Sequence, residues 1–245
     1  MSVHNSEIYI SSAIKSILNQ TYKEFEFIIV NDGSTDRTLD IIKSFKDSRI
    51  KIINKKHSGL TKSLNLAIAQ SKYNLLARQD ADDFSYKRRL ELQLTEFKKN
   101  ERLCLVATRA KINFGNKKFL TPSYLNKNIK KLLKYKNIII HPSVMIRKDF
   151  FKTINFYDEK YIVSQDYAAW SRLSSNVKYE FKILDNILIN RHIEKESISL
   201  KKNFLQSKNS FVIRKNNINI FINFLLFIHQ YLTNLIPINF KFYKK

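Results

Sequence analysis

The segment FEFIIVNDGSTDRTLDIIKSF, residues 25–45, joins a strand pattern, an acidic turn and a helix pattern. Residues 25–30 form a short apolar run, as in a buried strand, and Leu39, Ile42 and Phe45 then recur at helical spacing. Gly33, one of only three glycines in the chain, falls in the turn between them. A glycine at that point suggests a backbone conformation that a Cβ would obstruct. The segment therefore predicts one βα unit with an acidic loop after its strand.

The same alternation extends to both sides of this unit. A helix is predicted over 10–18, followed after the unit by a strand at 50–53, a helix at 60–68 and a strand at 74–77. This βαβαβ order predicts an α/β protein with a mostly parallel sheet flanked by helices, and ligands bound beyond the carboxyl ends of the strands. Further strands are predicted in a less regular second half, at 104–108, 143–146 and 179–184.

The composition is that of a folded, strongly basic protein. The 245 residues include 44 Lys and Arg against 21 Asp and Glu, for a net charge of +23, so nucleic acids, phosphorylated small molecules and anionic membranes are all candidate partners. The single cysteine, Cys104, cannot form an internal disulfide and is interpreted as a core thiol. The first residues show no signal peptide, which predicts a cytoplasmic location.

The C-terminal part of the chain has a different pattern. Residues 217–240 are rich in Ile, Leu and Phe but are interrupted by Asn and Gln, which disfavours a membrane-spanning helix. We expect a domain over 1–200 and an amphipathic helical tail over 201–245. The tail is either an interfacial helix pair on an anionic membrane or a helix pair packed on the domain, and the sequence leaves both open.

A cluster of carboxylates in ARQDADDFS, residues 77–85, stands out in so basic a chain. Asp80 and Asp82 are one residue apart and follow a predicted strand, so both can face one hard cation such as Mg²⁺ or Mn²⁺. Asp83 is expected to cap the next helix, as Asp36 caps the helix near residue 38. Arg78 is placed to meet a phosphate or to pair with Asp80. By itself the Asp-x-Asp pattern is a weak signal, because surface pairs of aspartates are common.

Four segments, in order, resemble the motifs of family 2 glycosyltransferases. They are SILNQTYKEFEFIIVNDGSTDRT (16–38), GLTKSLNLAIAQSKYNLLARQDADDFS (59–85), HPSVMIRK (141–148) and QDYAAWSRL (165–173). Several motifs in order are far more specific than any one of them. The resemblance covers about residues 3–200. It implies a GT-A fold, a nucleotide-diphospho-sugar donor with UDP-sugars as first candidates, a divalent cation, and inverting transfer to a glycan or lipid-linked acceptor at the inner face of the membrane.

The resemblance also implies roles for single residues. Asp166 resembles the base that takes a proton from the acceptor hydroxyl, and Asp32 resembles the residue that binds the nucleobase. The other implied contacts are Gly59, Arg78, Asp80 and Arg191 for the donor, Asp82, Asp80 and His192 for the cation, and His141 and Trp170 for the acceptor cleft. From the residues alone, Asp166 is as well explained as a helix N-cap, and Trp170 as a core residue.

The chain departs from the family pattern at three places. Gln165 stands where a Glu is frequent, and Asn155 and Phe156 replace paired glycines, which predicts a narrower acceptor side. Of the usual first strand only Val3 and Asn5 remain. We therefore expect a truncated first strand, from a shortened gene or a misassigned start, with neighbouring strand edges exposed.

The sequence is compatible to different degrees with three functions other than sugar transfer. A degenerate relative could bind a nucleotide sugar without turnover, as the shortened first strand suggests. A phosphatase with an Asp-x-Asp loop would carry that loop near the start of its fold, which this chain does not. A nucleic-acid binder would leave both acidic loops without a purpose, so no nucleic-acid partner is expected.

Overall fold

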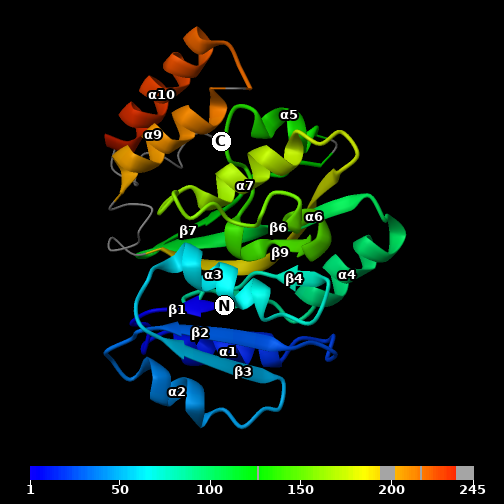
Figure 1. The fold of residues 1–245 in the computed structure, drawn as a ribbon, viewed down its shortest axis with the longest axis vertical. Helices are drawn as coiled ribbons and strands as arrows, with labels where there is room; N and C mark the ends of the chain where they lie inside the picture. The colour runs from blue at the N-terminus through cyan, green and yellow to red at the C-terminus, as the bar shows by residue number, and fades with distance from the viewer. Residues whose placement is uncertain (126, 194–201, 216, 236–245) are drawn as a thin grey trace.

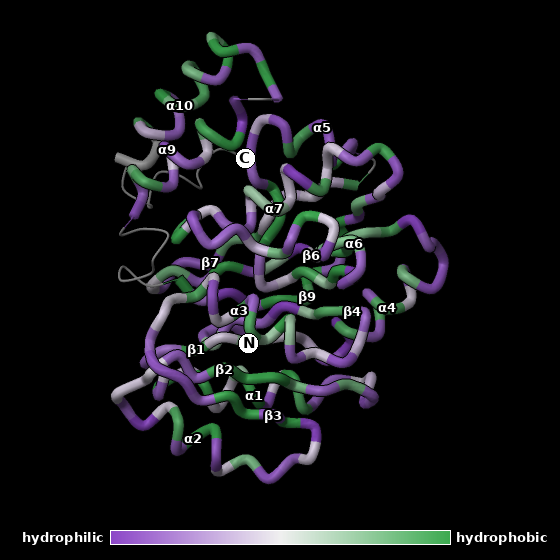
Figure 2. Tube along the Cα trace, viewed as in Figure 1, coloured by the Kyte–Doolittle hydropathy of each residue, from purple (hydrophilic) through white to green (hydrophobic). Residues whose placement is uncertain are grey.

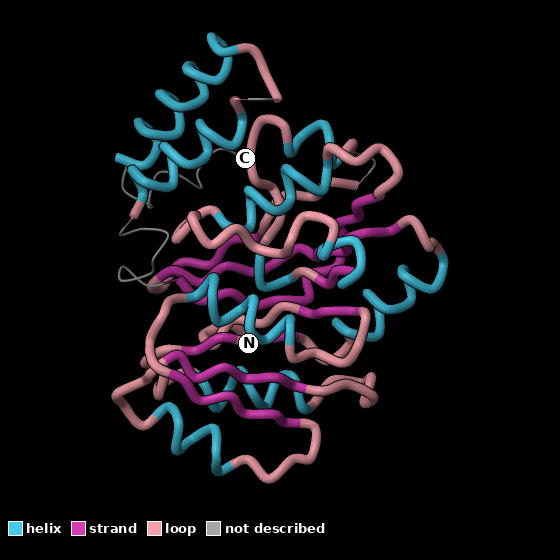
Figure 3. The backbone as a smooth tube through the Cα atoms, in the orientation of Figure 1, coloured by secondary structure: helices cyan, strands magenta, loops and turns pink. Residues whose placement is uncertain are grey.

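The computed structural model describes residues 1–125, 127–193, 202–215 and 217–235. Its strands form two sheets, one above the other along the long axis of the molecule, with helices around them (Figures 1 and 3). The first sheet is parallel, in the order β1 (Ser2–Val3), β2 (Phe27–Asp32) and β3 (Ile50–Lys55). The second is mixed, in the order β4 (Leu75–Ala77), β8 (Met145–Arg147), β6 (Leu103–Phe114), β9 (Glu180–Ile193) and β5 (Phe84–Ser85), with β7 (Lys117–Leu120) paired to β6. Each of the six strands expected from the sequence overlaps one of these.

The helices of the first half form where the apolar spacing predicts them. They are α1 (Ile10–Leu18), α2 (Thr38–Ser44) and α3 (Leu60–Ala69). In α1, Ile10, Ile14 and Ile17 share one face, because residues three and four apart lie on the same side of a helix. They are buried in one cluster with Phe27 and Ile29 of β2. The whole of β2 is buried, as expected for a parallel strand covered on both faces, and Figure 2 colours much of it hydrophobic.

The second half builds a separate core between its sheet and its helices. These helices are α4 (Arg89–Lys99), α5 (Ile129–Leu133), the 3₁₀ turn η1 (His141–Ser143), α6 (Lys148–Lys152) and α7 (Gln165–Ser174). Trp170 and Phe151 pack there with Leu105 and Cys104. Burial raises the pKa of the Cys104 thiol to about 12, which confirms the interpretation as a core thiol.

The first strand is short, as the sequence predicts. β1 pairs Ser2 with Val30 and Val3 with Asn31, so it borders only the carboxyl-terminal part of β2. No strand pairing of the described residues joins the first sheet to the second. A cavity of about 430 Å³ lies between them, with Phe27 and Ile28 among its lining on the side of β2. We call this boundary between the two sheets the seam.

The tail is a helical hairpin, and residues 201, 216 and 236–245 of it lie outside the described part. α9 (Asn203–Arg214) packs against α7, and α10 (Ile220–Leu235) packs against α9. The Asn209 side chain donates to the Val163 carbonyl at 2.9 Å, which ties α9 to the segment preceding α7. Within the described residues, no helix has the length and apolar character needed to cross a bilayer.

Candidate active site

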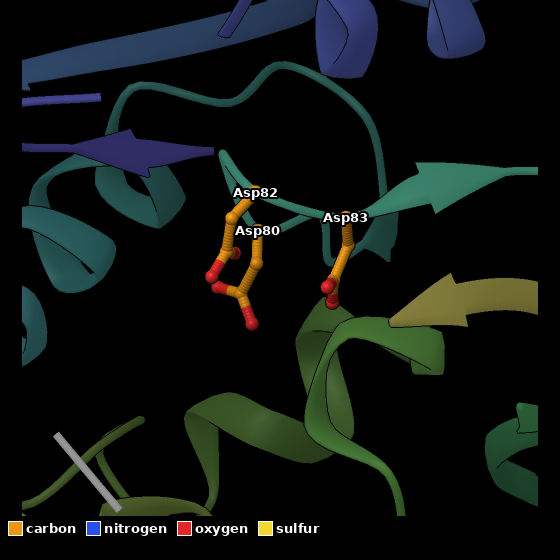
Figure 4. Close-up of side chains that lie close together, drawn as sticks. All are labelled: Asp80, Asp82 and Asp83. Atoms are coloured by element: carbon orange, nitrogen blue, oxygen red, sulfur yellow. The ribbon is translucent and has the colours of Figure 1, made fainter. Parts of the chain in front are cut away.

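Three carboxylates converge in the loop that follows β4, which we call the acidic loop (residues 80–83). Oxygen atoms of Asp80, Asp82 and Asp83 all lie within 4.8 Å of one another, and Figure 4 shows the three side chains on the same side of the loop. Asp80 pairs with the guanidinium of Arg78, as one of the two sequence interpretations expected. Asp83 Oδ1 accepts from the backbone N–H of His192 at 3.0 Å, while its buried Oδ2 has no partner among the described atoms.

The three carboxyl groups differ in how readily they ionise. Partial desolvation raises the pKa of Asp82 to about 6, although its side chain remains exposed, and the charge of Asp80 adds to the shift. Asp83 is buried, and burial together with the charges of Asp80 and Asp82 raises its pKa well above its usual value. For Asp80, burial acts in the same direction and is the largest single cause, but the charge and hydrogen bond of Arg78 together with other nearby positive groups, Arg191 among them, outweigh it and the pKa is lowered. The Arg191 guanidinium favours the ionised form of all three groups, which places its charge close to the acidic loop.

The acidic loop rests on a buried polar network that the sequence did not reveal. Arg89 is fully buried and donates to the Arg78 carbonyl at 2.6 Å, to Ser85 Oγ at 2.9 Å and to Gln79 Oε1 at 3.1 Å. The Gln79 side-chain amide in turn donates to the carbonyls of Asp80 and Asp83 at 3.0 and 2.7 Å. These bonds fix the backbone of the loop through its carbonyl groups, so the carboxylates are not needed to hold the loop in place.

A signal for this network exists in the sequence. Arg89 and Gln93 are one helical turn apart on the face of α4 that also carries Phe97, and all three are buried. The Gln93 amide donates to the carbonyls of Val106 and Ser143 at 2.7 and 2.8 Å. Polar residues spaced four apart, in line with an apolar residue on the same helix face, are therefore the sequence pattern that indicates this network.

The expected helix cap at Asp83 is wrong. Strand β5 intervenes after the acidic loop, and α4 begins six residues later, with Arg88 at its N-cap position. Asp83 is instead held by β9 through the His192 bond. Asp36 lies one residue before the N-cap position of α2, which Arg37 occupies, but its Oδ1 does accept from the Thr38 backbone N–H at 3.0 Å at the start of that helix.

Asp32 lies at the carboxyl end of β2, where the sequence placed it, and anchors a second loop. Its carboxylate pairs with Lys55 and accepts from the backbone N–H groups of Ser58 and Gly59 at 3.0 and 2.8 Å. Burial opposes ionisation, but these partners outweigh it and lower the Asp32 pKa to about 2. Gly59 has a φ of 96° and occupies the N-cap position of α3. The structure thus ties Asp32 to Gly59 directly, while the nucleobase contact of Asp32 stays a prediction.

Gly33 fits the expectation of a position closed to a Cβ. Its φ is 70°, and an added Cβ would lie 2.6 Å from the backbone nitrogen of His57. That approach is far inside van der Waals contact with backbone that cannot easily move. The glycine therefore lets the loop after β2 pack against the loop before α3.

The proposed base, Asp166, lies in the first turn of α7. Its Oδ2 accepts from the Asn137 amide at 2.8 Å, a partner that the sequence did not indicate. The N-cap position is occupied by Ser164, with a φ of 64°, so the alternative interpretation of Asp166 as the N-cap is wrong. Asn155 and Phe156 also have positive φ, 55° and 58°, so the chain keeps the backbone turn that glycines favour even without them.

His141 contacts Tyr157 and, on the helix that carries Asp166, Trp170. Burial lowers its pKa to about 4, aided by the nearby charge of Arg78, so the imidazole is neutral at physiological pH. His141 Nε2 lies 2.8 Å from the Tyr157 hydroxyl. Trp170 packs edge-on to the His141 ring, with centroids 6.2 Å apart, but is itself fully buried. Trp170 is therefore a core residue that supports His141, and its expected place in the wall of the acceptor cleft is corrected.

The expected cation ligand His192 is directed elsewhere. Its Nε2 lies 3.3 Å from the Tyr9 hydroxyl, and the two rings are 5.0 Å apart. It does not belong to the group of converging carboxylates found in the described residues. The structure brings the backbone of His192 to the acidic loop through Asp83, and the role of its ring as a metal ligand is not supported by this geometry.

The comparison with protein families agrees with this arrangement. The sequence model described as "Glycosyl transferase family 2" matches residues 1–155. The chain belongs to glycosyl transferase family 2. The O-antigen biosynthesis glycosyltransferase WbnJ of Escherichia coli is 34% identical over 207 residues, which are 80% of this chain and 79% of that relative. The chain is thus a glycosyltransferase related to enzymes of surface polysaccharide synthesis.

Solved structures give the fold. TarS of S. aureus in complex with UDP-GlcNAc superposes with a TM-score of 0.70 at 17% identity, over 95% of this chain and 71% of TarS. The mannosyltransferase PcManGT of Pyrobaculum calidifontis, in complex with GDP-Man and Mn²⁺, superposes with a TM-score of 0.67 at 12% identity, over 95% of this chain and 68% of that chain. Both are GT-A glycosyltransferases, so the predicted GT-A fold is confirmed.

Proposed function

We propose that the protein transfers a sugar, with inversion, from a nucleotide-diphospho-sugar to a glycan or lipid-linked acceptor for a cell-surface polysaccharide. UDP-sugars are the first candidates for the donor, since a UDP-sugar occupies TarS. The proposal assigns catalysis to residues 1–200 and attachment at the inner face of the membrane to the tail. The observation that carries it is the convergence of three carboxylates in the acidic loop, beyond the carboxyl end of β4.

The acidic loop fits a hard divalent cation. Its donors are carboxylate oxygens, the ligands that Mg²⁺ and Mn²⁺ favour. The pKa values of Asp82 and Asp83 are both raised, in part by the charges of neighbouring carboxylates, and a bound cation would relieve that repulsion. Asp80 and Asp82 would hold the ion. When bound, it would neutralise charge that develops on the leaving diphosphate.

The remaining residues divide the work of binding and proton transfer. Arg78 and Arg191 bring positive charge to the acidic loop, where the diphosphate of a donor would lie. Asp166 takes the proton of the acceptor hydroxyl as that oxygen attacks the sugar, and its bond from Asn137 fixes the carboxylate orientation. His141 is neutral and lies 2.8 Å from the Tyr157 hydroxyl. In this proposal it shapes the space between donor and acceptor.

The test is donor hydrolysis over a panel of nucleotide sugars, with Mn²⁺, with Mg²⁺ and with a chelator. We expect turnover that the chelator abolishes. Asp82→Ala and Asp166→Ala should each reduce it to background, since removing a general base alone costs on the order of 10²–10⁴-fold. Asp40→Ala, which removes an exposed carboxylate from α2, is the matched control and should keep wild-type activity. Turnover that survives both site substitutions would refute the assignment.

A further inference from the structure

The polar side of α10 faces inward. Asn223 is fully buried, its Oδ1 accepts from Arg214 Nε at 2.9 Å, and its amide donates to the Phe211 carbonyl at 2.9 Å. Two helical turns further along α10, Gln230 Oε1 accepts from Arg214 Nη1 at 3.3 Å. Asn223 and Gln230 are seven residues apart, so they lie on one stripe of the helix. Arg214 of α9 therefore fixes which face of α10 is turned toward the protein.

The opposite side of α10 is apolar and exposed. Phe221, Phe224, Leu225, Ile228 and Leu232 follow helical spacing and are each between 37 and 67% exposed. Figure 2 shows hydrophobic and hydrophilic residues alternating along this helix. Several large apolar side chains exposed on one face of a helix are typical of an interaction surface. A rotation of α10 about its own axis could bury these side chains only by breaking the hydrogen bonds from Arg214 to Asn223 and Gln230.

The charge of the tail selects the partner for this face. After Glu196 the sequence contains no Asp or Glu, but eight Lys and Arg. Lys202, Lys208 and Lys215 are exposed in the described part. A second copy would bring an equally cationic tail, on a chain with a net charge of +23, so pairing of two such faces is opposed by repulsion. An anionic lipid surface attracts the same charges and accepts the apolar side chains.

The position of the hairpin relates this face to the proposed acceptor side. α9 packs against α7, the helix that carries Asp166, and the Asn217 amide donates to Ser171 Oγ of α7 at 3.0 Å. Figure 1 shows the hairpin at one end of the long axis and the sheet of β2 and β3 toward the other. A bilayer at the hairpin would thus lie nearer to Asp166 than to Asp32.

We propose that the outward face of α10 inserts into the interfacial layer of an anionic bilayer, with the helix lying in the membrane plane. This deepens the proposed function, on which its relevance to a lipid-linked acceptor rests, by naming the residues that dock. The bound protein then presents the Asp166 side of its site to acceptors held in the same membrane.

The test is flotation of the full-length protein with vesicles of phosphatidylcholine and phosphatidylglycerol, against pure phosphatidylcholine vesicles. Wild-type protein should float with the anionic vesicles and at least tenfold less with the neutral ones. The variant F221N/F224N/L225N should lose at least tenfold in partitioning, because it replaces three of the apolar side chains that would leave water on insertion. The matched control is L120N/V177N, which removes two exposed apolar side chains elsewhere and should float like wild type.

Three outcomes overturn the docking proposal. They are wild-type protein that stays with the unbound fraction, equal flotation of the α10 variant and the control, and a concentration-dependent dimer in sedimentation that the α10 variant abolishes. Circular dichroism verifies that each variant is folded. Donor hydrolysis without vesicles is measured on the same samples: activity without flotation refutes docking alone, whereas flotation without activity refutes the catalytic proposal alone.

Discussion

Among the described residues, three arginines are buried: Arg78, which pairs with Asp80, Arg89 beneath the acidic loop, and Arg214 in the hairpin. The last two invite comparison. Arg89 and Arg214 both bind neutral oxygens, and in both cases burial is the main cause of a lowered pKa. Around Arg89, the charges of Asp83 and Asp80 oppose that effect. Around Arg214, the opposing group is Tyr167. A buried guanidinium therefore serves as a rigid donor frame at both places, but only the first lies beside carboxylates that can balance its charge.

Removing the frame beneath the acidic loop should have the larger effect. Arg89→Met removes the guanidinium donors from buried side-chain acceptors, Gln93 Oε1 among them, and from two backbone carbonyls. It also removes a cation from beside the acidic loop. We expect a loss of about 3–5 kcal/mol in the free energy of unfolding, measured with urea, and weaker Mn²⁺ binding by calorimetry.

The neighbouring Arg88→Met is the control for this change. Its side chain is exposed and pairs with Glu91 on the surface, so the cost should stay within about 0.5 kcal/mol. Equal losses for Arg88 and Arg89 would show that the buried network contributes no stability of its own.

Removing the frame in the hairpin should have a smaller and local effect. Arg214→Met frees Asn223 and Gln230 from their donor, at a cost of about 1–3 kcal/mol. We expect faster hydrogen exchange in α9 and α10, with the sheets unchanged and donor hydrolysis retained. Lys215→Met, at the next and exposed position, should alter neither. Faster exchange throughout the protein would contradict the view that the hairpin is a separate unit.

The third substitution, Asp82→Asn, tests the charge balance near Arg89. Its expected effect on stability is the smallest of the three. The Asp82 pKa of about 6 lies above its usual value of 3.8, so ionisation of Asp82 costs stability in the metal-free protein above pH 6. Below about pH 4 the carboxyl group is protonated in both the folded and the unfolded chain, and this cost disappears. Asp82→Asn should therefore raise the melting temperature with chelator at pH 7.5, and the gain should shrink as the pH falls toward 4.

A gain that persists unchanged at pH 4 would assign the effect of Asp82→Asn to something other than charge. Asp40→Asn, on the exposed surface of α2, should change the melting temperature at neither pH. Added Mn²⁺ should remove the advantage of Asp82→Asn, because the ion compensates the wild-type carboxylate.

The fold could be predicted where local spacing decides it. Ile10, Ile14 and Ile17 mark α1 by periodicity alone, and the apolar run of β2 is readable because both of its faces are buried. The acidic loop was found because Asp80 and Asp82 follow a strand. The support beneath it was not, because an arginine within KRRLELQ looks solvated until the face of α4 that it occupies is known.

Contacts between segments far apart in the sequence account for the other features that the sequence did not predict. Asp83 resembles a helix cap in sequence, but its partner, the backbone of His192, is 109 residues away. Lys55 is likewise invisible as the partner of Asp32 until β2 and β3 pair. In the tail, hydropathy shows two faces of α10 but not which one is inward, because that choice depends on Arg214 in another helix.

The seam between the sheets has a mechanical consequence. α3 contacts β2, and its Leu64 and Ile68 pack in the core of the second sheet, so side chains connect the two sheets where no strand pairing of the described residues does. Packed side chains permit small sliding movements that a hydrogen-bonded ladder resists. Asp32 belongs to one sheet and the acidic loop follows the edge strand of the other. The spacing between the two ends of the proposed donor site is therefore compliant, and it can change slightly without breaking a strand-to-strand hydrogen bond.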